Sequence, residues 1–156
     1  MKSFTRLALL LFLSLLFASC SFPVDINHPQ DCTPLFNDES RLVNPADSYF
    51  YRARDFDQSS DEVWLSFRDF SGVDTIHRIS CSQPCLVSLG LDVLVDSDQY
   101  KLVLVDTGRQ KVLSLCQGPY LGRCLLYLPA GTHSLRAVGC SVSGRVIATL
   151  DILGDR

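Results

Sequence analysis

RVIATLDIL (residues 145–153) is the stretch that decides the fold, because its apolar and polar side chains alternate. Apolar residues occupy positions 146, 148, 150 and 152, and polar residues occupy three of the positions between and before them. A strand turns successive side chains to opposite faces, so this pattern places one face in a core and the other in water. Residues 62–68 and 86–95 show the same period of two.

Segments with strand patterns recur along the rest of the chain. Residues 100–105 are apolar on both faces, which predicts a central strand. Turns are predicted at 106–108, 129–131 and 141–144, where Gly, Pro, Asp and Ser gather. The spacing predicts an all-β protein, an antiparallel β-sandwich of about seven to nine strands. The candidate strands are 49–54, 62–68, 73–79, 86–95, 99–106, 110–116, 123–128, 132–139 and 145–153.

LPAGTHSLR (residues 128–136) contains one of these turns and the start of the strand after it. The stretch resembles the closing hairpin of small envelope β-domains of the transthyretin or immunoglobulin type, in which a proline-glycine turn leads into the next-to-last strand. The resemblance implies a transthyretin- or immunoglobulin-like sandwich and transfers no function.

The chain begins with an export signal. Lys2 and Arg6 form a positively charged start, and residues 7–17 are apolar apart from Ser14. This run is too short for a membrane-spanning helix, which needs about 20 residues. We therefore predict that residues 1–19 are a signal peptide that is removed.

FASC (residues 17–20) closes this leader and resembles the lipobox of bacterial lipoproteins. In that family, small residues precede a cysteine that receives a diacylglyceryl thioether and becomes the mature N-terminus. The resemblance implies that Cys20 is lipidated and anchors the protein in a membrane of the cell envelope, on the periplasmic or surface side of an outer membrane. Ordinary signal-peptidase cleavage, for instance after Ser21, is the alternative and gives a secreted protein.

Residues 20–48 carry four prolines among Asp, Asn and Ser and show no helix or strand period. They predict a tether that holds the domain off the membrane. Within this segment, residues 38–43 favour a short helical turn with Asn37 or Asp38 as its cap. Residues 49–156 then form one sandwich domain, because the mature chain is long enough to bury a core.

Six cysteines follow the leader, and an even set in an exported protein predicts disulfide bonds. Six cysteines allow many pairings, among which the sequence does not choose. Two local pairings are attractive: Cys116–Cys124 would close a hairpin over residues 117–123, and Cys81–Cys85 would close a tight turn. The remaining pair, Cys32–Cys140, would fasten the tether to the penultimate turn.

Charge and motifs exclude several functions. Removing Lys2 and Arg6 with the leader leaves 12 basic residues against 17 acidic ones, a net charge of −5. Without a basic cluster, we expect neither nucleic-acid binding nor attraction to anionic lipid by a polybasic patch. No Gly-x-Ser-x-Gly elbow accompanies His133, so this histidine is interpreted as a strand residue rather than a catalytic base. We predict no enzyme activity and no cofactor.

Two segments have the spacing of metal ligands. His77, Cys81 and Cys85 recur at every fourth residue, as ligands on one helix face would. The segment has a strand pattern, contains Pro84, and carries thiols that oxidise on export, so we predict no metal there. Residues 55–62 begin like a calcium loop but lack its glycine and its final glutamate, which favours a solvated acidic loop.

Aromatic residues are the candidates for recognition. Tyr49, Phe50 and Tyr51 share one predicted strand, so at least one of them should face away from the core. Tyr120 would lie at the tip of the cystine hairpin. We predict partner binding by Tyr49, Tyr51 and Tyr120, because rigidly displayed tyrosines make good contact surfaces, with packing as the alternative. Trp64 lies on the polar side of its strand and is either a binding platform or second-layer core.

Together these features predict a non-catalytic lipoprotein of the cell envelope. It would act as a binding or assembly module, an accessory of a larger complex, with a protein partner in the same membrane. The alternative is a small-protein inhibitor of an envelope or host hydrolase, in which the cystine loop 117–123 would plug an active site.

Overall fold

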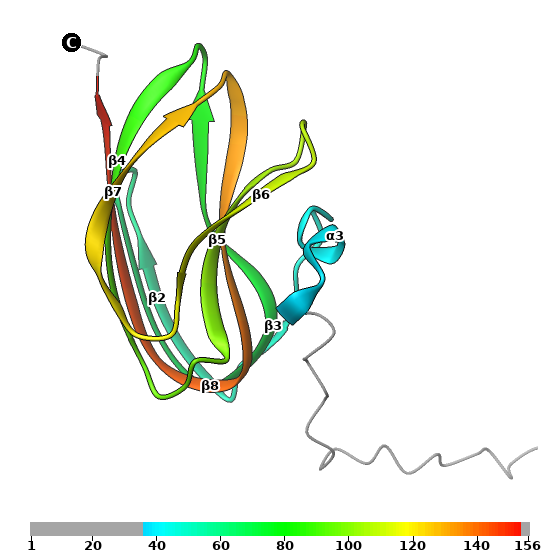
Figure 1. Cartoon of the computed structure of the whole chain (residues 1–156). Coiled ribbons are helices and arrows are strands. Elements are labelled where there is room, and N and C mark those ends of the chain that lie inside the picture. Colours follow the sequence, from blue (N-terminus) through cyan, green and yellow to red (C-terminus); the bar gives the residue numbers. More distant parts are fainter. Residues whose placement is uncertain (1–35, 154–156) are drawn as a thin grey trace, which may run out of the picture.

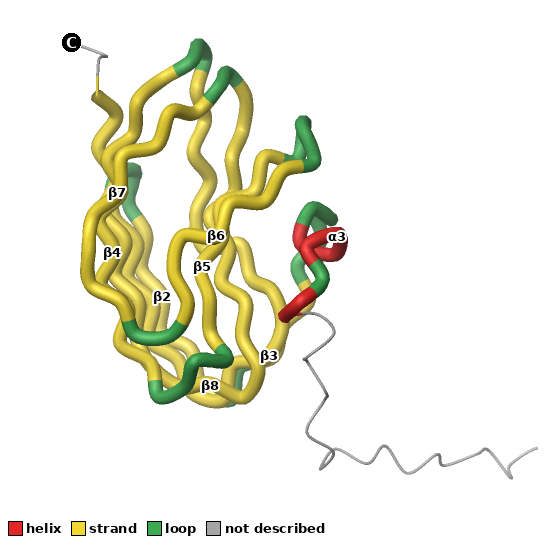
Figure 2. The backbone as a smooth tube through the Cα atoms, in the orientation of Figure 1, coloured by secondary structure: helices red, strands yellow, loops and turns green. Residues whose placement is uncertain are grey.

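Eight antiparallel strands and the short helix α3 organise residues 36–153, the part of the chain that the computed structural model describes (Figures 1 and 2). The expected all-β antiparallel sandwich is therefore confirmed. The elements are α3 (Glu39–Leu42), β1 (Ser48–Phe50), β2 (Ala53–Gln58), β3 (Glu62–Cys81), β4 (Cys85–Val95), β5 (Tyr100–Asp106), β6 (Lys111–Gln117), β7 (Tyr120–Leu128) and β8 (Gly131–Leu153).

Two long strands, β3 and β8, pair with each other and contribute to both layers of the sandwich. The second half of β8 also pairs with β4, whereas its first half pairs with β5. We call the two layers sheet 1 and sheet 2, and Figure 1 shows β4 and β7 in one and β5 and β6 in the other. Sheet 1 contains β2, residues 62–67 of β3, residues 144–153 of β8, β4 and β7; sheet 2 contains β1, residues 71–81 of β3, residues 131–139 of β8, β5 and β6.

Bends within β3 and β8 carry the chain from one sheet to the other. In β3, the pairing shifts on both sides of Phe70, and Gly72 has a φ of 117°. A Cβ atom at Gly72 would lie 2.1 Å from the carbonyl oxygen of Ser48, so β1 can pair there only beside a glycine. In β8, Ser141 has a φ of 53°.

The eight strands lie within the expected seven to nine, but these bends change which candidate segments are separate strands. Segments 62–68 and 73–79 are two halves of β3, and segments 132–139 and 145–153 are two halves of β8. Accordingly, the turn expected at 141–144 is a bend inside β8, because hydrogen bonding to β3 resumes at once on the other side. The expected strand 49–54 is instead divided between β1 and β2.

The core lies between the two sheets and is formed by the inward-facing positions predicted from the alternation. In residues 145–153, Val146 and Ala148 are fully buried and Leu150 is nearly so. Four aromatic rings fill the region beside the bends and contact one another edge-on or stacked. These rings belong to Tyr51, Phe67, Phe70 and Tyr100.

Residues 36–47, which we call the cover segment, pack on the outer face of sheet 2 (Figure 1). Phe36 and Leu42 are buried there against Val103 and Val105 of β5, so both faces of β5 are covered, as expected for residues 100–105. The predicted helical turn is α3, and its cap Asp38 accepts a hydrogen bond from the backbone N–H of Ser40 at 3.0 Å.

The cover segment therefore belongs to the domain and not to the tether, contrary to the expected boundary at residue 48. The predicted signal peptide, Cys20, Cys32 and the rest of the predicted tether lie outside the described residues. No helix within residues 36–153 is long and apolar enough to cross a membrane.

A buried arginine fastens the cover segment to sheet 2. Arg136 of β8 is only 2% exposed, and its guanidinium donates to the carbonyl oxygens of Leu42 (2.6 Å), Asn44 (2.5 Å) and Ala46 (3.0 Å). It also forms an ion pair with Asp47 at 2.7 Å. The carbonyl oxygens would otherwise be left without donors where the segment packs on the sheet.

Candidate binding surface

The outer face of sheet 1 gathers apolar side chains that the core does not use. On β4, the odd positions from Val87 to Val95 point into the core, so the even positions point outward. Register places Leu86 beside Tyr127 of β7 and Asp92 beside Leu121, so these pairs share the outer face. We call the following set the apolar patch: Leu86 and Leu94 of β4, Leu121, Leu125 and Tyr127 of β7, and Leu153 of β8.

The side chains of β7 are the most exposed part of the apolar patch. Leu121 is 83% exposed, Tyr127 is 72% exposed and Leu125 is 63% exposed. Scattered apolar residues are normal on a protein surface, but contiguous ones mark interaction sites. The patch is therefore the strongest candidate for a binding surface among the described residues.

Polar groups lie among the side chains of the apolar patch. Arg123, between Leu121 and Leu125 on β7, donates to the hydroxyl of Ser88 at 3.2 Å, and Arg145 lies 3.4 Å from the carboxylate of Asp92. Protein interfaces combine apolar contacts with hydrogen-bonding groups of this kind.

Tyr120, which was predicted to recognise a partner, begins β7 on the inner side of that strand. It is paired with Val93, a core residue, and its ring lies over Gly122 so closely that a Cβ atom there would be 2.5 Å from the Tyr120 hydroxyl. The side chain is about one-third exposed, at 36%. Tyr120 thus lies at the edge of the core, and its predicted binding role stays a prediction.

Tyr51 is a packing residue in the structure. Its ring stacks on Phe70 at a centroid distance of 4.6 Å, and its hydroxyl donates to Asp74 at 2.8 Å. Burial raises the pKa of Tyr51, and the neighbouring carboxylate raises it further. Tyr49 is half-exposed on β1, next to the more exposed Phe50, so this pair remains accessible.

Trp64 is half-buried on the outer face of sheet 1, where its register partners are Ile147 of β8 and Asp57 of β2. It extends the apolar patch across the sheet. Of the two alternatives for Trp64, the structure thus excludes a place in the core between the sheets.

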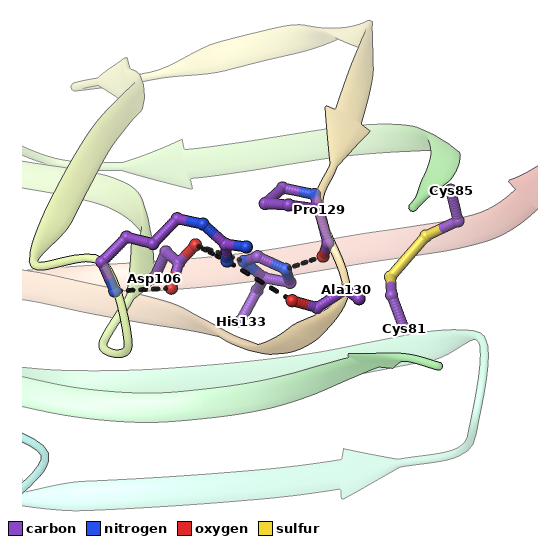
Figure 3. The surroundings of a disulfide bond; sticks show 7 residues. Cys81, Cys85, Asp106, Pro129, Ala130 and His133 are labelled. Atoms are coloured by element: carbon purple, nitrogen blue, oxygen red, sulfur yellow. Dashed lines mark hydrogen bonds and ion pairs between the residues drawn. A yellow bond between two sulfur atoms is a disulfide. The ribbon is translucent and has the colours of Figure 1, made fainter. Parts of the chain in front are cut away.

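The predicted Cys81–Cys85 disulfide is present and closes the turn between β3 and β4 (Figure 3). The turn links sheet 2 to sheet 1 at one end of the sandwich. Both sulfurs of the supposed His77–Cys81–Cys85 metal set are consumed by this bond. His77 instead accepts a hydrogen bond from Gln58 at 2.7 Å, and burial lowers its pKa.

The predicted Cys116–Cys124 disulfide is absent from the structure, and both residues are thiols. The expected hairpin is also absent, because β6 pairs with β5 in sheet 2 while β7 pairs with β4 in sheet 1. The link at Gly118 and Pro119 crosses from one sheet to the other, so no cystine loop protrudes. Cys140 is half-buried, and its predicted partner Cys32 lies outside the described residues.

We expect the two thiols to resist alkylation in the native protein. Burial raises the pKa of Cys116, the nearby Cys124 raises it further, and burial raises the pKa of Cys124 as well. Because the thiolate is the reactive form, iodoacetamide at pH 8 should modify both at least roughly tenfold more slowly than a small thiol. Denaturant without reductant should release both, as counted by mass spectrometry. If neither position gains an alkyl group after denaturation, Cys116 and Cys124 are joined by the disulfide that the sequence predicted.

His133 lies in a structural network near the disulfide (Figure 3). Its Nε2 donates to the carbonyl oxygen of Pro129 at 2.9 Å, and its Nδ1 lies 3.9 Å from the carboxylate of Asp106. Burial opposes ionisation of Asp106, but hydrogen bonds and charge from Arg109 at 2.9 Å keep its pKa low. Within the described chain no hydroxyl or thiol is hydrogen-bonded to His133, so the network lacks a nucleophile.

The acidic loop at 55–62 is divided between β2 and a turn. Asp55 and Asp57 belong to β2, whereas Asp61 accepts hydrogen bonds from the hydroxyls of Ser59 and Ser60. Among residues 36–153, no group of His, Cys, Asp and Glu is arranged to hold a metal ion. A hollow of about 600 Å³ opens between this turn, residues 77–80 and the end of β8.

Comparisons with known proteins show no relative by sequence: no family model and no curated protein matches the chain. Among solved structures, two mutants of a family 29 carbohydrate-binding module are similar in outline. Each has a TM-score of 0.34, at 2% and 5% identity, over 67% and 70% of this chain and 79% and 78% of theirs. Drosophila melanogaster CENP-C bound to CAL1 gives a TM-score of 0.27 at 10% identity, over 77% of this chain and 96% of that one. Similarity this low transfers neither ligand nor partner.

Sequence reasoning missed the apolar patch. Its signal is the run CLLYL (residues 124–128), which is apolar on both faces and therefore has the pattern of a strand covered on both sides. The structure places the run in β7, where Leu125 and Tyr127 lie on an outer face that none of the residues 36–153 covers. The clue is a strand that is apolar on both faces although only one of its faces is covered.

Proposed function

We propose that this protein is a non-catalytic module of the cell envelope that binds or assembles a protein partner, held at the membrane by a lipid on Cys20. One observation carries the proposal. The outer face of sheet 2 is covered by residues 36–47, whereas the outer face of sheet 1 carries the apolar patch with no covering element among the described residues.

The composition of the apolar patch favours a protein partner. Leucines and a tyrosine supply apolar area, and Arg123 and Arg145 supply hydrogen-bond donors among them. Tyrosine and arginine are enriched among residues that dominate binding energies at interfaces. The net charge of −5 for the mature chain does not favour nucleic acid or an anionic membrane surface as the ligand.

The experiment that tests the proposal is partner capture from solubilised envelope membranes. Leu94→Ser removes an apolar side chain that is 58% exposed on β4, one residue past the last pair of β4 with β7. We expect it to weaken capture of a specific partner about fivefold or more, because an exposed anchor contributes about 1 kcal/mol or more to a complex and little to the fold. Quantitative mass spectrometry of the captured proteins is the measurement.

Leu113→Ser is the matched control, since Leu113 is 48% exposed on β6 of sheet 2. It should capture the partner as the wild type does. Equal losses with both variants, or none with either, would contradict the proposed surface.

A second arm tests the lipid anchor. Cys20→Ala should leave the protein unprocessed or soluble while the wild type partitions into detergent, since two or three acyl chains anchor a protein stably. Equal partitioning of the two proteins would remove the lipoprotein part of the proposal. The inhibitor alternative is not pursued, because no described feature favours it: residues 117–123 form no cystine loop.

A further inference from the structure

β7 is an edge strand of sheet 1. All nine of its residues lie on one edge of the sandwich, and the one strand that pairs with it among residues 36–153 is β4. The backbone groups on its other side are therefore available to a further strand.

β1 and β2 are protected edge strands: β1 has three residues, and three of the six residues of β2 are charged. β6 carries one charge at its first residue, Lys111, and β7 is the longest edge strand of the described sandwich, with nine residues. β7 carries a single charge, Arg123, which already donates to Ser88. Short length and charged side chains are the usual means of keeping an edge from pairing, so an edge without them is a pairing site.

We propose that β7 pairs antiparallel with β7 of a second copy of this chain about a twofold axis. The two copies of sheet 1 then form one continuous sheet, and the two apolar patches join across the axis. A twofold axis uses the same surface on both copies and closes after two, which suits a single edge. The inference goes beyond the proposed function, because it concerns the edge of β7 and not the binding of a different partner.

Charge complementarity selects the register. When the twofold axis passes between Leu125 and Leu125 of the partner subunit, these two residues pair with each other. Arg123 then lies opposite Tyr127 of the partner subunit on the outer face. A guanidinium over a tyrosine ring is an attractive pair. If the axis passed through the Arg123 pair, the two guanidinium groups would lie directly opposite each other. If it passed through the Cys124 pair, they would lie on neighbouring diagonal positions. Like charges repel in both registers.

The area available argues for a weak dimer. One strand pairing with its side chains buries less than the roughly 1,200 Å² of a standard stable interface. If Cys20 is lipidated, confinement to a membrane raises the effective concentration of the two copies, so a weak contact suffices there.

The test uses the full mature chain with Cys20→Ala, so that lipid cannot drive association. Leu125→Lys and Leu125→Asp are prepared separately, and sedimentation equilibrium is measured over about a hundredfold range of concentration. We expect the parent chain to shift from monomer toward dimer as concentration rises. Each Leu125 variant alone should associate at least tenfold more weakly, because it opposes like charges at the axis. An equimolar mixture should recover association as a heterodimer.

Leu113→Lys and Leu113→Asp on β6 are the matched controls and should associate as the parent does. Because Leu125 is 63% exposed, its substitutions should leave the thermal unfolding midpoint nearly unchanged, which circular dichroism checks. A parent chain that stays monomeric throughout overturns the dimer. A mixture that associates no better than its components overturns the axis at Leu125. Neither result bears on the Leu94→Ser capture experiment.

Discussion

Arg136→Met should lower the free energy of unfolding by about 3 to 5 kcal/mol, the usual cost of removing one partner of a buried charged network. Arg136 is 2% exposed and donates to the carbonyl oxygens of Leu42, Asn44 and Ala46 as well as pairing with Asp47. Methionine matches much of the aliphatic volume but takes the guanidinium donor from three carbonyl oxygens and leaves Asp47 with its hydrogen bonds from Thr75. Hydrogen bonds to charged groups contribute about 1.5 to 3 kcal/mol each, so a large loss is expected even after partial solvation.

Urea denaturation monitored by circular dichroism measures the change. Arg145→Met is the matched control, because Arg145 is an arginine of the same strand whose pair with Asp92 is exposed on both sides (47% and 40%). Exposed pairs contribute about 1 kcal/mol at most. Equal destabilisation by the two variants would show that the Arg136 network does not hold the cover segment to sheet 2.

Limited proteolysis adds a local readout for Arg136→Met. Loss of the clamp should expose residues 36–47 to cleavage before global unfolding, because the middle of the segment loses its hydrogen bonds to the sheet, while Lys101 and Thr75 still hold Phe36 and Asp47 at its ends. Cleavage first at the loops of sheet 1 would contradict this order.

Phe70→Ala should destabilise the protein by about 3 to 5 kcal/mol, the range for a phenylalanine removed from a core. Phe70 is fully buried at the bend of β3, where its ring contacts Tyr51, Phe67 and Tyr100. It also covers Gly139 of β8, where a Cβ atom would lie 2.6 Å from the ring. The ring thus fills the space in which both long strands change sheets, and alanine would leave a cavity there.

Phe50→Ala controls for the loss of a ring as such, because Phe50 is 62% exposed on β1. It should change stability by about 0.5 kcal/mol or less. Gly139→Ala gives a second check: it should cost about 1 to 3 kcal/mol by overpacking, and clearly less when combined with Phe70→Leu. Additive effects of Gly139→Ala and Phe70→Leu would show that the ring and the glycine are not coupled.

Local pattern predicted the elements well where one face was buried and the other solvated. The alternation at 145–153 and at 86–95 identified the buried residues of β8 and β4, since the period of a strand is a property of the backbone alone. The helix cap at Asp38 and the short closure Cys81–Cys85 were also readable, because both depend on residues a few positions apart.

Pattern failed where the partner of a segment lies far along the chain. A turn was predicted at 141–144 and a break between two strands at 69–72, but both places are bends because β3 and β8 stay paired across them. Cys116 and Cys124 look like the ends of a hairpin, yet their strands join different sheets. Which strand lies next to which is a choice among long-range pairings, and composition does not encode it locally.

By itself, the sequence determined an all-β chain with an alternating core and no catalytic motif, and it predicted export and a short Cys81–Cys85 disulfide. Only the tertiary structure decided which apolar residues on the outer faces of the two sheets are covered. It placed residues 36–47 over sheet 2 through Arg136, and it left the equally apolar β7 at an open edge of sheet 1. The physical reason is that burial depends on a neighbour in space: Val103 and Leu125 have the same apolar character, but the chain folds a cover over the first and none of the described residues over the second.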